Sequence, residues 1–335
     1  MRMAMCALLP MLASCATPQV QPRLPPQIAP TLEAAHAVMA DGYRLPFTVW
    51  RPAGEVKAVV LALHGMNDYR NAFATVGPYL AGRGIATYAY DQRGFGQTRW
   101  AGLWPATDRL VDDLRTMAAL LHAEHPGQPL YLMGESMGGA VILASQGQSM
   151  PPGYSGALLI APAVWGRTTM HPAQRALLWL AAHTVPGWQV SGKALDILPS
   201  DNQEMLKALG RDPLVIKKTR IDVLYGISQL MDDALAAAPR LNGPALILYG
   251  VRDEIIPRAP VCRLLSLLPQ GRARQWRAVV YSNGYHMLTR DLQADVVLAD
   301  IAAWLDDPAS PLPSGEELNE ANSASSTMCR QGSRE

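Results

Sequence analysis

The chain has 335 residues, of which 49% are hydrophobic and 17% charged, which is enough apolar material for one large domain or for a core domain with an insertion. The formal net charge is +1 and no block of basic residues occurs, so there is no electrostatic reason to expect a nucleic-acid binder. No stretch reaches the roughly 20 uninterrupted apolar residues of a membrane-spanning helix.

The N-terminus has the features of an export signal. One early arginine precedes a short apolar run, and the run ends in LASC, which resembles a bacterial lipobox. On this interpretation residues 1–14 are a lipoprotein signal peptide, and Cys15 carries lipid and becomes the new N-terminus. The Pro- and Gln-rich residues 15–35 would form an extended tether. The chain would then be an exported bacterial lipoprotein anchored to a membrane. Ala16 favours the outer membrane or its periplasmic face, and an ordinary cleaved signal peptide is the alternative.

Two of the four cysteines lie beyond this leader. An oxidising compartment would permit a disulfide between Cys262 and Cys329. Because Cys329 lies in a polar tail, we expect the two thiols to be unpaired.

From about residue 36 the chain shows alternating strand and helix patterns. A hairpin is expected in AHAVMADGYRLPFTVWRP, with its turn at Asp41-Gly42. Buried strands are expected at KAVVLALHG, GIATYAYDQRG, PLYLMGES, GALLIAPA, PALILYG and ARQWRAVVYS. Helices are expected at residues 71–82, 109–125, 136–150, 257–268 and 290–305. This order indicates an α/β fold with a mostly parallel, doubly wound sheet that is covered on both faces.

The alternation breaks at residues 164–242, which are helical or irregular and contain no clear strand. We interpret this segment as a helical cap inserted between two strands, so that the core comprises residues 36–163 and 243–307. Apolar cap segments such as ALLWLAAHTVPGW could line an acyl channel or only cover the sheet. Residues 308–335 have few large apolar side chains and are expected to be disordered.

Ser136 lies in GESMG, directly after an apolar strand and before an apolar helix. In that setting G-x-S-x-G is the strand–turn–helix elbow that lifts a serine hydroxyl clear of the sheet. The glycines are required because a side chain at either flank would clash with the neighbouring helix or strand. We therefore interpret Ser136 as a nucleophile at the carboxyl edge of the sheet, where the sites of such folds lie.

A serine hydroxyl needs a base and an acid that orients the base. The chain order Ser, acid, His selects His286, which follows the last expected strand. Asp253 follows a buried strand between the two and is the candidate acid; its alternative role is a helix N-cap. The adjacent Glu254 is the fallback for the acid.

A tetrahedral intermediate needs two backbone N–H donors. We expect one from Met137, the residue after the nucleophile, and the other from Met66, in the loop after the strand that ends at His64. His64 itself is assigned a structural part in shaping that loop. Metal and cofactor are both expected to be unnecessary, since the sequence has no HExxH motif, Cys/His cluster or phosphate-binding glycine loop.

These features together resemble the alpha/beta-hydrolase superfamily. More narrowly, they resemble the serine hydrolases grouped with monoacylglycerol lipases and bacterial lysophospholipases, which carry a serine aminopeptidase S33-type domain. The matching segments are LALHGMNDYRNAF, YAYDQRGFGQT, VDDL, GESMGGAVIL, LILYGVRDEIIP and GYHML, across about residues 40–305. The residues that the resemblance implies for the site are the triad Ser136, Asp253 and His286 and the oxyanion-hole amides of Met66 and Met137. It also implies that DQRGFGQ is a structural turn, in which Asp91 and Arg93 pair or bond backbone groups and the glycines permit tight packing.

The resemblance implies a serine carboxylic ester hydrolase that acts on lipid esters such as monoacylglycerols or lysophospholipids through an acyl-enzyme. A serine aminopeptidase or acyltransferase of the same fold is an alternative. A peptidase would need acidic cap residues to hold an α-amino group, and the candidates are Asp196, Asp201, Glu204 and Asp212. A non-catalytic surface-binding lipoprotein is a further alternative, which the complete set of triad and oxyanion residues disfavours.

Overall fold

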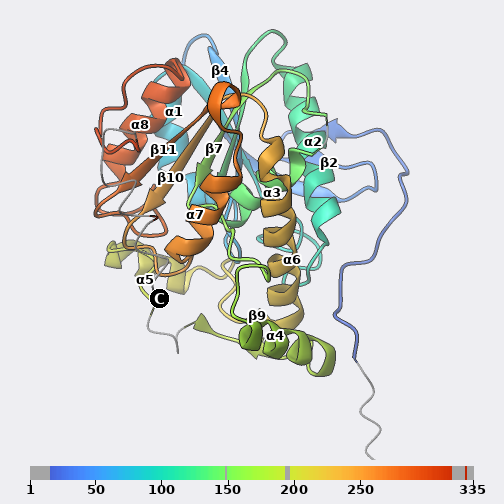
Figure 1. Ribbon diagram of the computed structural model, residues 1–335. Helices are drawn as coiled ribbons and strands as arrows, with labels where there is room; N and C mark the ends of the chain where they lie inside the picture. Colours follow the sequence, from blue (N-terminus) through green and yellow to red (C-terminus); the bar gives the residue numbers. More distant parts are fainter. Residues whose placement is uncertain (1–15, 148, 193–196, 319–328, 330–335) are drawn as a thin grey trace, which may run out of the picture.

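The computed structural model describes residues 16–147, 149–192, 197–318 and 329. Within these ranges a nine-stranded sheet forms the centre of the molecule, in the order β1-β2-β3-β5-β4-β6-β7-β10-β11 (Figure 1). Its strands are β1 (Thr31–Leu32), β2 (His36–Val38), β3 (Arg44–Trp50), β4 (Ala58–Leu63), β5 (Ile85–Tyr90), β6 (Leu130–Glu135), β7 (Tyr154–Ile160), β10 (Ala245–Gly250) and β11 (Trp276–Tyr281).

The pairing directions confirm the expected sheet. The six strands from β5 to β11 in this order are parallel, and β1, β2 and β3 add an antiparallel edge. Every residue of β4, β5, β6 and β10 is buried, which explains their unbroken apolar sequences. The expected hairpin is β2 and β3, and Gly42 in its turn has a φ of +76°.

Helices cover both faces of the sheet. Side chains of α1 and α8 pack on one face, and those of α2, α3, α6 and α7 pack on the other (Figure 1). The helices are α1 (Val76–Ala81), α2 (Thr107–Glu124), α3 (Met137–Ser145), α4 (Pro172–Thr184), α5 (Gln203–Arg211), α6 (Ile221–Ala237), α7 (Arg258–Leu267) and α8 (Ala294–Asp306). The expected helix over residues 71–82 is divided into a 3₁₀ turn, Arg70–Phe73, and α1. None of the described helices is long and apolar enough to cross a membrane.

The segment expected to be a cap is mostly helical, with one short ribbon of β8 (Gln189–Val190) and β9 (Thr219–Arg220). Helix α6 belongs to the layer that covers the sheet, which is one of the two roles considered for the apolar cap segments. Its side chains Ile227, Leu230 and Ala234 are buried in the core together with those of α3. Helix α4 lies beyond that layer, at the bottom of the molecule in Figure 1, and α5 lies apart from it on the left.

Residues 16–35, expected to be an extended tether, lie against the domain. Val20 forms a β-bridge with Trp104, and the buried Gln21 donates from Nε2 to the carbonyl of Leu103 at 2.8 Å. A polar segment can be fixed in this way because its side-chain amide satisfies a loop carbonyl. The expected lipid-bearing Cys15 lies outside the described residues.

The expectation of disorder is wrong for residues 308–318. Strand β11 is the edge of the sheet, so its outer backbone groups are available for pairing. The Leu318 amide donates to the Ala278 carbonyl at 2.8 Å, and Glu317 forms an ion pair with Arg277 at 2.6 Å. Leu312 is buried in the core.

The expectation of unpaired thiols is also wrong, since Cys262 in α7 and Cys329 form a disulfide that spans 67 residues. A tail that pairs with the edge strand is already held against the domain, so its low hydrophobicity did not exclude a disulfide.

Candidate active site

Ser136 lies on a strained turn between β6 and α3. Its φ of +51° and ψ of −112° are unfavourable for a residue with a side chain, and it is the N-cap of α3. A Cβ added to Gly134 would lie 2.4 Å from the Gly138 carbonyl carbon, and one added to Gly138 would lie 2.1 Å from the Leu63 carbonyl oxygen. Both flanking glycines are therefore required by backbone contacts, as the sequence pattern predicts.

Asp253 and His286 lie side by side beyond the carboxyl ends of β10 and β11. The His286 Nδ1 is 2.8 Å from the Asp253 Oδ2. The other carboxylate oxygen accepts the backbone N–H groups of Ile255 and Ile256, at 2.8 and 2.9 Å. With Nδ1 donating to the carboxylate, Nε2 is the ring nitrogen that can accept a proton.

The alternatives to Asp253 do not fit this arrangement. Glu254 accepts the backbone N–H of Leu198 at 2.8 Å, and no hydrogen bond to His286 is recorded for it in the described part of the chain. Helix α7 begins after Pro257, so Asp253 is not its N-cap. Asp253 instead closes the turn before that helix and orients the imidazole.

The surroundings of His286 raise the pKa of its imidazole. Burial alone would lower that pKa, but the Asp253 carboxylate, through its charge and its hydrogen bond, more than offsets burial. The Glu135 carboxylate raises the pKa further, and the Arg290 guanidinium acts in the opposite direction.

A buried ion-pair network connects the loop of His286 to the turn of Ser136. Arg290, four residues after His286, donates to Glu135 at 2.5 Å and to Asp68 at 2.7 Å. Glu135 directly precedes Ser136, so the network holds the His286 loop beside the nucleophile turn. No hydrogen bond joins the Ser136 hydroxyl to the His286 ring among the described residues.

The sequence analysis missed this network. Arg290, Glu135 and Asp68 all lie next to motif residues, in the segments GYHMLTR, GES and GMND. A charged residue directly beside each of three motifs could have been predicted to take part in the site.

The segments that carry the two expected oxyanion donors both adjoin Ser136. Met137 is the first residue of α3, where backbone N–H groups have no intrahelical acceptor. A Cβ built on Gly65 would lie 3.4 Å from the Ser136 Cβ, so the loop that leads to Met66 packs directly against the serine. This position is where amides could hold an oxyanion.

His64 shapes that loop. Its ring is fully buried, and Nε2 accepts the Gln92 backbone N–H at 3.0 Å, which leaves Nδ1 to donate to the Gly65 carbonyl at 2.7 Å. The ring is neutral because Nε2 accepts a hydrogen bond, and burial, which lowers the pKa of His64, favours the same form. These bonds turn the Gly65 carbonyl toward the histidine and support the structural part assigned to it.

The turn DQRGFGQ is held in part by the expected bonds and in part by other partners. Asp91 accepts the backbone N–H groups of Arg70 and Gln97, at 2.9 and 2.8 Å, which is the expected backbone bonding. Arg93 does not pair with Asp91. It bonds the buried Asp113, at 2.6 Å from Nε, and Asp41, at 2.7 Å from Nη1.

The glycines of this turn have the expected packing role. Gly94 and Gly96 have positive φ angles, and a Cβ on Gly96 would lie 2.3 Å from the Asp91 carboxylate. The turn therefore serves to hold the loops at the sheet edge in place.

Three of the four acidic cap residues considered for an aminopeptidase are described, and each has a hydrogen-bond or ion-pair partner. Asp201 accepts the Leu292 backbone N–H at 2.9 Å, and Asp212 accepts the Tyr69 hydroxyl at 2.7 Å. Glu204 pairs with Lys207 on the exposed side of α5, and Asp196 lies outside the described residues. The described cap thus gives no specific support for an α-amino site.

Residues 54–293, which are most of the chain, match the family described as serine aminopeptidase, S33. The chain belongs to this family. A monoacylglycerol lipase of Mycolicibacterium smegmatis is 28% identical over 79% of this chain and 93% of its own length. The human monoglyceride lipase is 26% identical over 85% of this chain and 94% of its own length.

Solved structures share the fold of this S33-family chain. The crystal structure of a soluble variant of the Saccharomyces cerevisiae monoglyceride lipase, in complex with a substrate analogue, has a TM-score of 0.69 and 21% identity, and it covers 88% of this chain and 98% of its own. A Paleococcus ferrophilus monoacylglycerol lipase gives a TM-score of 0.64 at 21% identity, over 78% of this chain and 98% of its own. The alpha/beta-hydrolase fold is therefore shown.

Proposed function

We propose that this ester hydrolase acts on lipid esters with one acyl chain, such as monoacylglycerols or lysophospholipids, through Ser136, His286 and Asp253. The observation that carries the proposal is the hydrogen bond between His286 and Asp253, in a loop tied by Arg290 to the strained turn of Ser136. The substrate class is supported by the relatives that are named monoacylglycerol and monoglyceride lipases.

In the proposed reaction the Ser136 hydroxyl attacks the ester carbonyl while the His286 Nε2 takes its proton. The amides of Met66 and Met137 hold the oxyanion of the tetrahedral intermediate. His286 then gives its proton to the leaving alcohol, and a water that the same imidazole activates releases the acid from Ser136. Asp253 stabilises the imidazolium that forms in each half-reaction.

The cap carries large apolar side chains that are exposed, which supports a lipid substrate. Large apolar side chains on and after α4 are highly exposed, at 68% for Leu177, 53% for Trp179 and 66% for Trp188. Exposed apolar surface of this kind commonly marks a contact with lipid or with another protein.

Two measurements test the proposed chemistry. A fluorophosphonate probe should label the protein, and Ser136→Ala should abolish the labelling. Hydrolysis should then be compared between p-nitrophenyl esters of increasing acyl length, monoacylglycerols, lysophosphatidylcholine and aminoacyl amides. Faster turnover of the aminoacyl amides than of every ester would replace this proposal by an aminopeptidase. Absence of both labelling and turnover in the folded protein would favour a non-catalytic binder.

We also propose that lipid on Cys15 anchors the enzyme to a membrane with its cap close to the bilayer. The nearby Gln19 donates its backbone N–H to Asp222 at 3.2 Å and accepts from Arg220 at 2.8 Å, at the start of α6. The described N-terminal segment thus runs to the end of the molecule that carries α4 (Figure 1). Cys15→Ala should move the protein from the detergent phase to the aqueous phase on Triton X-114 partitioning; unchanged partitioning would refute the anchor.

A further inference from the structure

Two neighbouring cavities follow the outward side of α6. One, of about 500 Å³, lies between α4 and α6, and the other, of about 540 Å³, lies between α6 and α7. Thr168 and Asp232 line both cavities, so the two are adjacent. Neither is lined by Ser136, Asp253 or His286.

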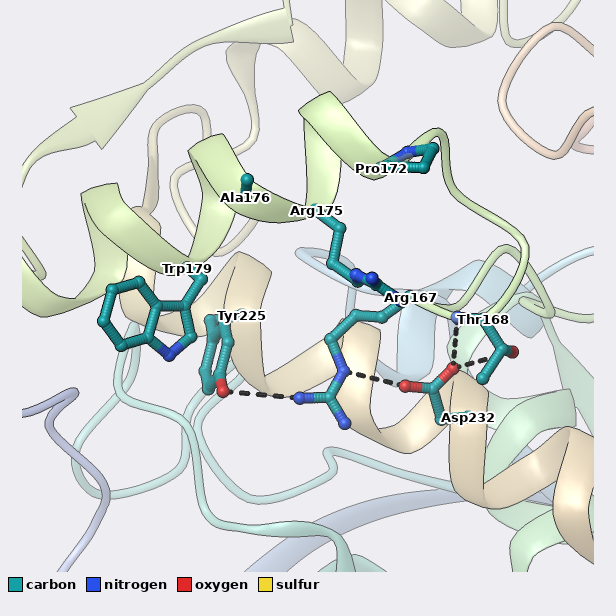
Figure 2. A pocket seen from close by; sticks show the side chains of 8 residues that line it. All are labelled: Arg167, Thr168, Pro172, Arg175, Ala176, Trp179, Tyr225 and Asp232. Atoms are coloured by element: carbon teal, nitrogen blue, oxygen red, sulfur yellow. Dashed lines mark hydrogen bonds and ion pairs between the residues drawn. The ribbon is translucent and has the colours of Figure 1, made fainter.

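The first cavity has more positive than negative charge. The Arg167 Nε donates to Asp232 at 2.7 Å, and Asp232 also accepts the backbone N–H and the hydroxyl of Thr168, both at 3.0 Å. The negative charge of Asp232 is thus matched by Arg167. Arg175 adds a second guanidinium, which extends from α4 toward Arg167 and has no anionic partner among the described residues (Figure 2).

The position of Arg175 is not explained by the stability of its own helix. Helix α4 begins at Pro172, so Arg175 is in the first turn, where the helix dipole disfavours a cation. The Arg167 guanidinium lines the same cavity. A bound anion would relieve the unfavourable dipole interaction, and guanidinium groups bind carboxylates and phosphates in paired hydrogen bonds.

The remaining walls suit an alkyl chain. Tyr225 lies beside Arg167 in the first cavity, and Trp179 lies beyond it (Figure 2). The second cavity is lined mostly by apolar side chains, among them Leu235, Ala236 and Leu267. From Tyr225 to Ala236, a rise of 1.5 Å per residue gives roughly 16 Å along α6.

We propose that these two cavities form a binding site for a single-chain anionic amphiphile. Its carboxylate or phosphate head group lies between Arg167 and Arg175, and its alkyl chain follows α6 toward Ala236. Arg167 is held in place for this role by Asp232 and by the Tyr225 hydroxyl, at 3.3 Å from Nη1. The site is separate from the proposed chemistry at Ser136 and does not depend on it.

The test measures binding of dodecanoate and of monododecyl phosphate by isothermal titration calorimetry. It uses the Ser136→Ala protein so that turnover does not interfere. Arg175→Gln should weaken the affinity for the preferred anion by about tenfold, the loss expected when one charged hydrogen-bond donor is removed. Arg272→Gln, which removes the same charge from an exposed turn outside both cavities, is the matched control and should bind as the parent does.

A second pair of variants tests the alkyl part of the site. Ala236→Trp fills the second cavity and should weaken dodecanoate binding, whereas Ala208→Trp, an exposed alanine on α5, should not. Tighter binding of dodecanoate or of dodecyl phosphate would identify the head group, and either result supports the site. Equal affinities for Arg175→Gln and Arg272→Gln, or equally tight binding of dodecyltrimethylammonium, would overturn it.

Discussion

The Arg290 guanidinium lies 2.5 Å from the Glu135 carboxylate and joins the loop of the proposed base to the residue before the proposed nucleophile. The same guanidinium bonds Asp68 in the loop after β4, at 2.7 Å. All three side chains are buried. One cation therefore holds together the three loops that carry His286, Ser136 and Met66, and it also contributes to the electrostatic environment of the His286 imidazole.

Arg290→Gln should shift the acid limb of the kcat/KM profile to higher pH. The charged groups that act on His286 are Asp253 and Glu135, which raise the pKa of the imidazole, and Arg290, which lowers it. Removal of Arg290 takes away the lowering effect and leaves Glu135 unneutralised, so the pKa rises further. His286 must be neutral to act as a base, and the pH at which activity is lost therefore rises. The measurement is kcat/KM against pH with a soluble p-nitrophenyl ester.

The control for this prediction is Arg290→Lys. It retains the charge, so the acid limb should stay near that of the parent while kcat falls, because one ammonium group does not match two carboxylates as the guanidinium fork does. Arg290→Gln also leaves two buried carboxylates unpaired, with an expected loss of about 3–5 kcal/mol in the free energy of unfolding. If both variants lower activity without any difference between their pH profiles, Arg290 has only a structural role.

Asp253→Asn should reduce kcat by roughly 10⁴-fold while the protein remains folded. The amide oxygen can still accept the N–H groups of Ile255 and Ile256, but it carries no charge to stabilise the imidazolium of His286. The pKa of the imidazole should fall for the same reason, since the Asp253 carboxylate raises it in the parent. Burst kinetics measures the loss of activity, and a melting curve checks that the variant is folded. A kcat within tenfold of the parent would contradict the assignment of Asp253.

Gly138→Ala should destabilise the protein by about 2–3 kcal/mol, because the new methyl group would overlap the backbone of Leu63. The strain acts on the first turn of α3, so the amide of Met137 should shift and activity should fall as well. Gly210→Ala is the matched control. It lies in α5 with open space around it, and the same substitution should stabilise the protein by about 0.5–1 kcal/mol. The measurement is the melting temperature of both variants. Similar melting temperatures would show that the turn tolerates a side chain.

Local patterns made the sheet and the turn of Ser136 predictable. Strands β4, β5, β6 and β10 are buried over their whole length, so their apolar runs are visible in the sequence. The two glycines around Ser136 are fixed by contacts within the elbow and with Leu63. The neighbourhood of Asp253 and His286 follows from their places beyond adjacent strands, β10 and β11.

The partners of buried charges could not be predicted in the same way. Arg290 bonds residues that lie 155 and 222 positions away, and Arg93 selects Asp41 and Asp113 over its neighbour Asp91. Such pairs depend on which loops lie close together in the folded protein. The local pattern of apolar and polar residues in the sequence contains no information on that. The order of residues 308–318 was missed for a related reason, since it comes from the free edge of β11 together with the buried Leu312, and a polar tail hides both signals.

The disulfide between Cys262 and Cys329 should stabilise the enzyme, so Cys329→Ser should lower the free energy of unfolding by about 2–4 kcal/mol. The bond closes a loop of 67 residues and restricts the unfolded chain. Reductant should lower the melting temperature of the parent to that of Cys329→Ser and should leave the variant unchanged.

Truncations separate this effect from the packing of the tail. A chain that ends at residue 318 lacks Cys329 but keeps the Leu312 contacts and the ion pair of Glu317 with Arg277. Its melting temperature should therefore equal that of the Cys329→Ser variant. A chain that ends at residue 307 loses those contacts as well and should melt at a lower temperature still, because the edge of β11 and the Arg277 side chain are then uncovered. Equal melting temperatures for the two truncations would show that residues 308–318 add no stability, and the disulfide would then be the only stabilising link that the tail provides.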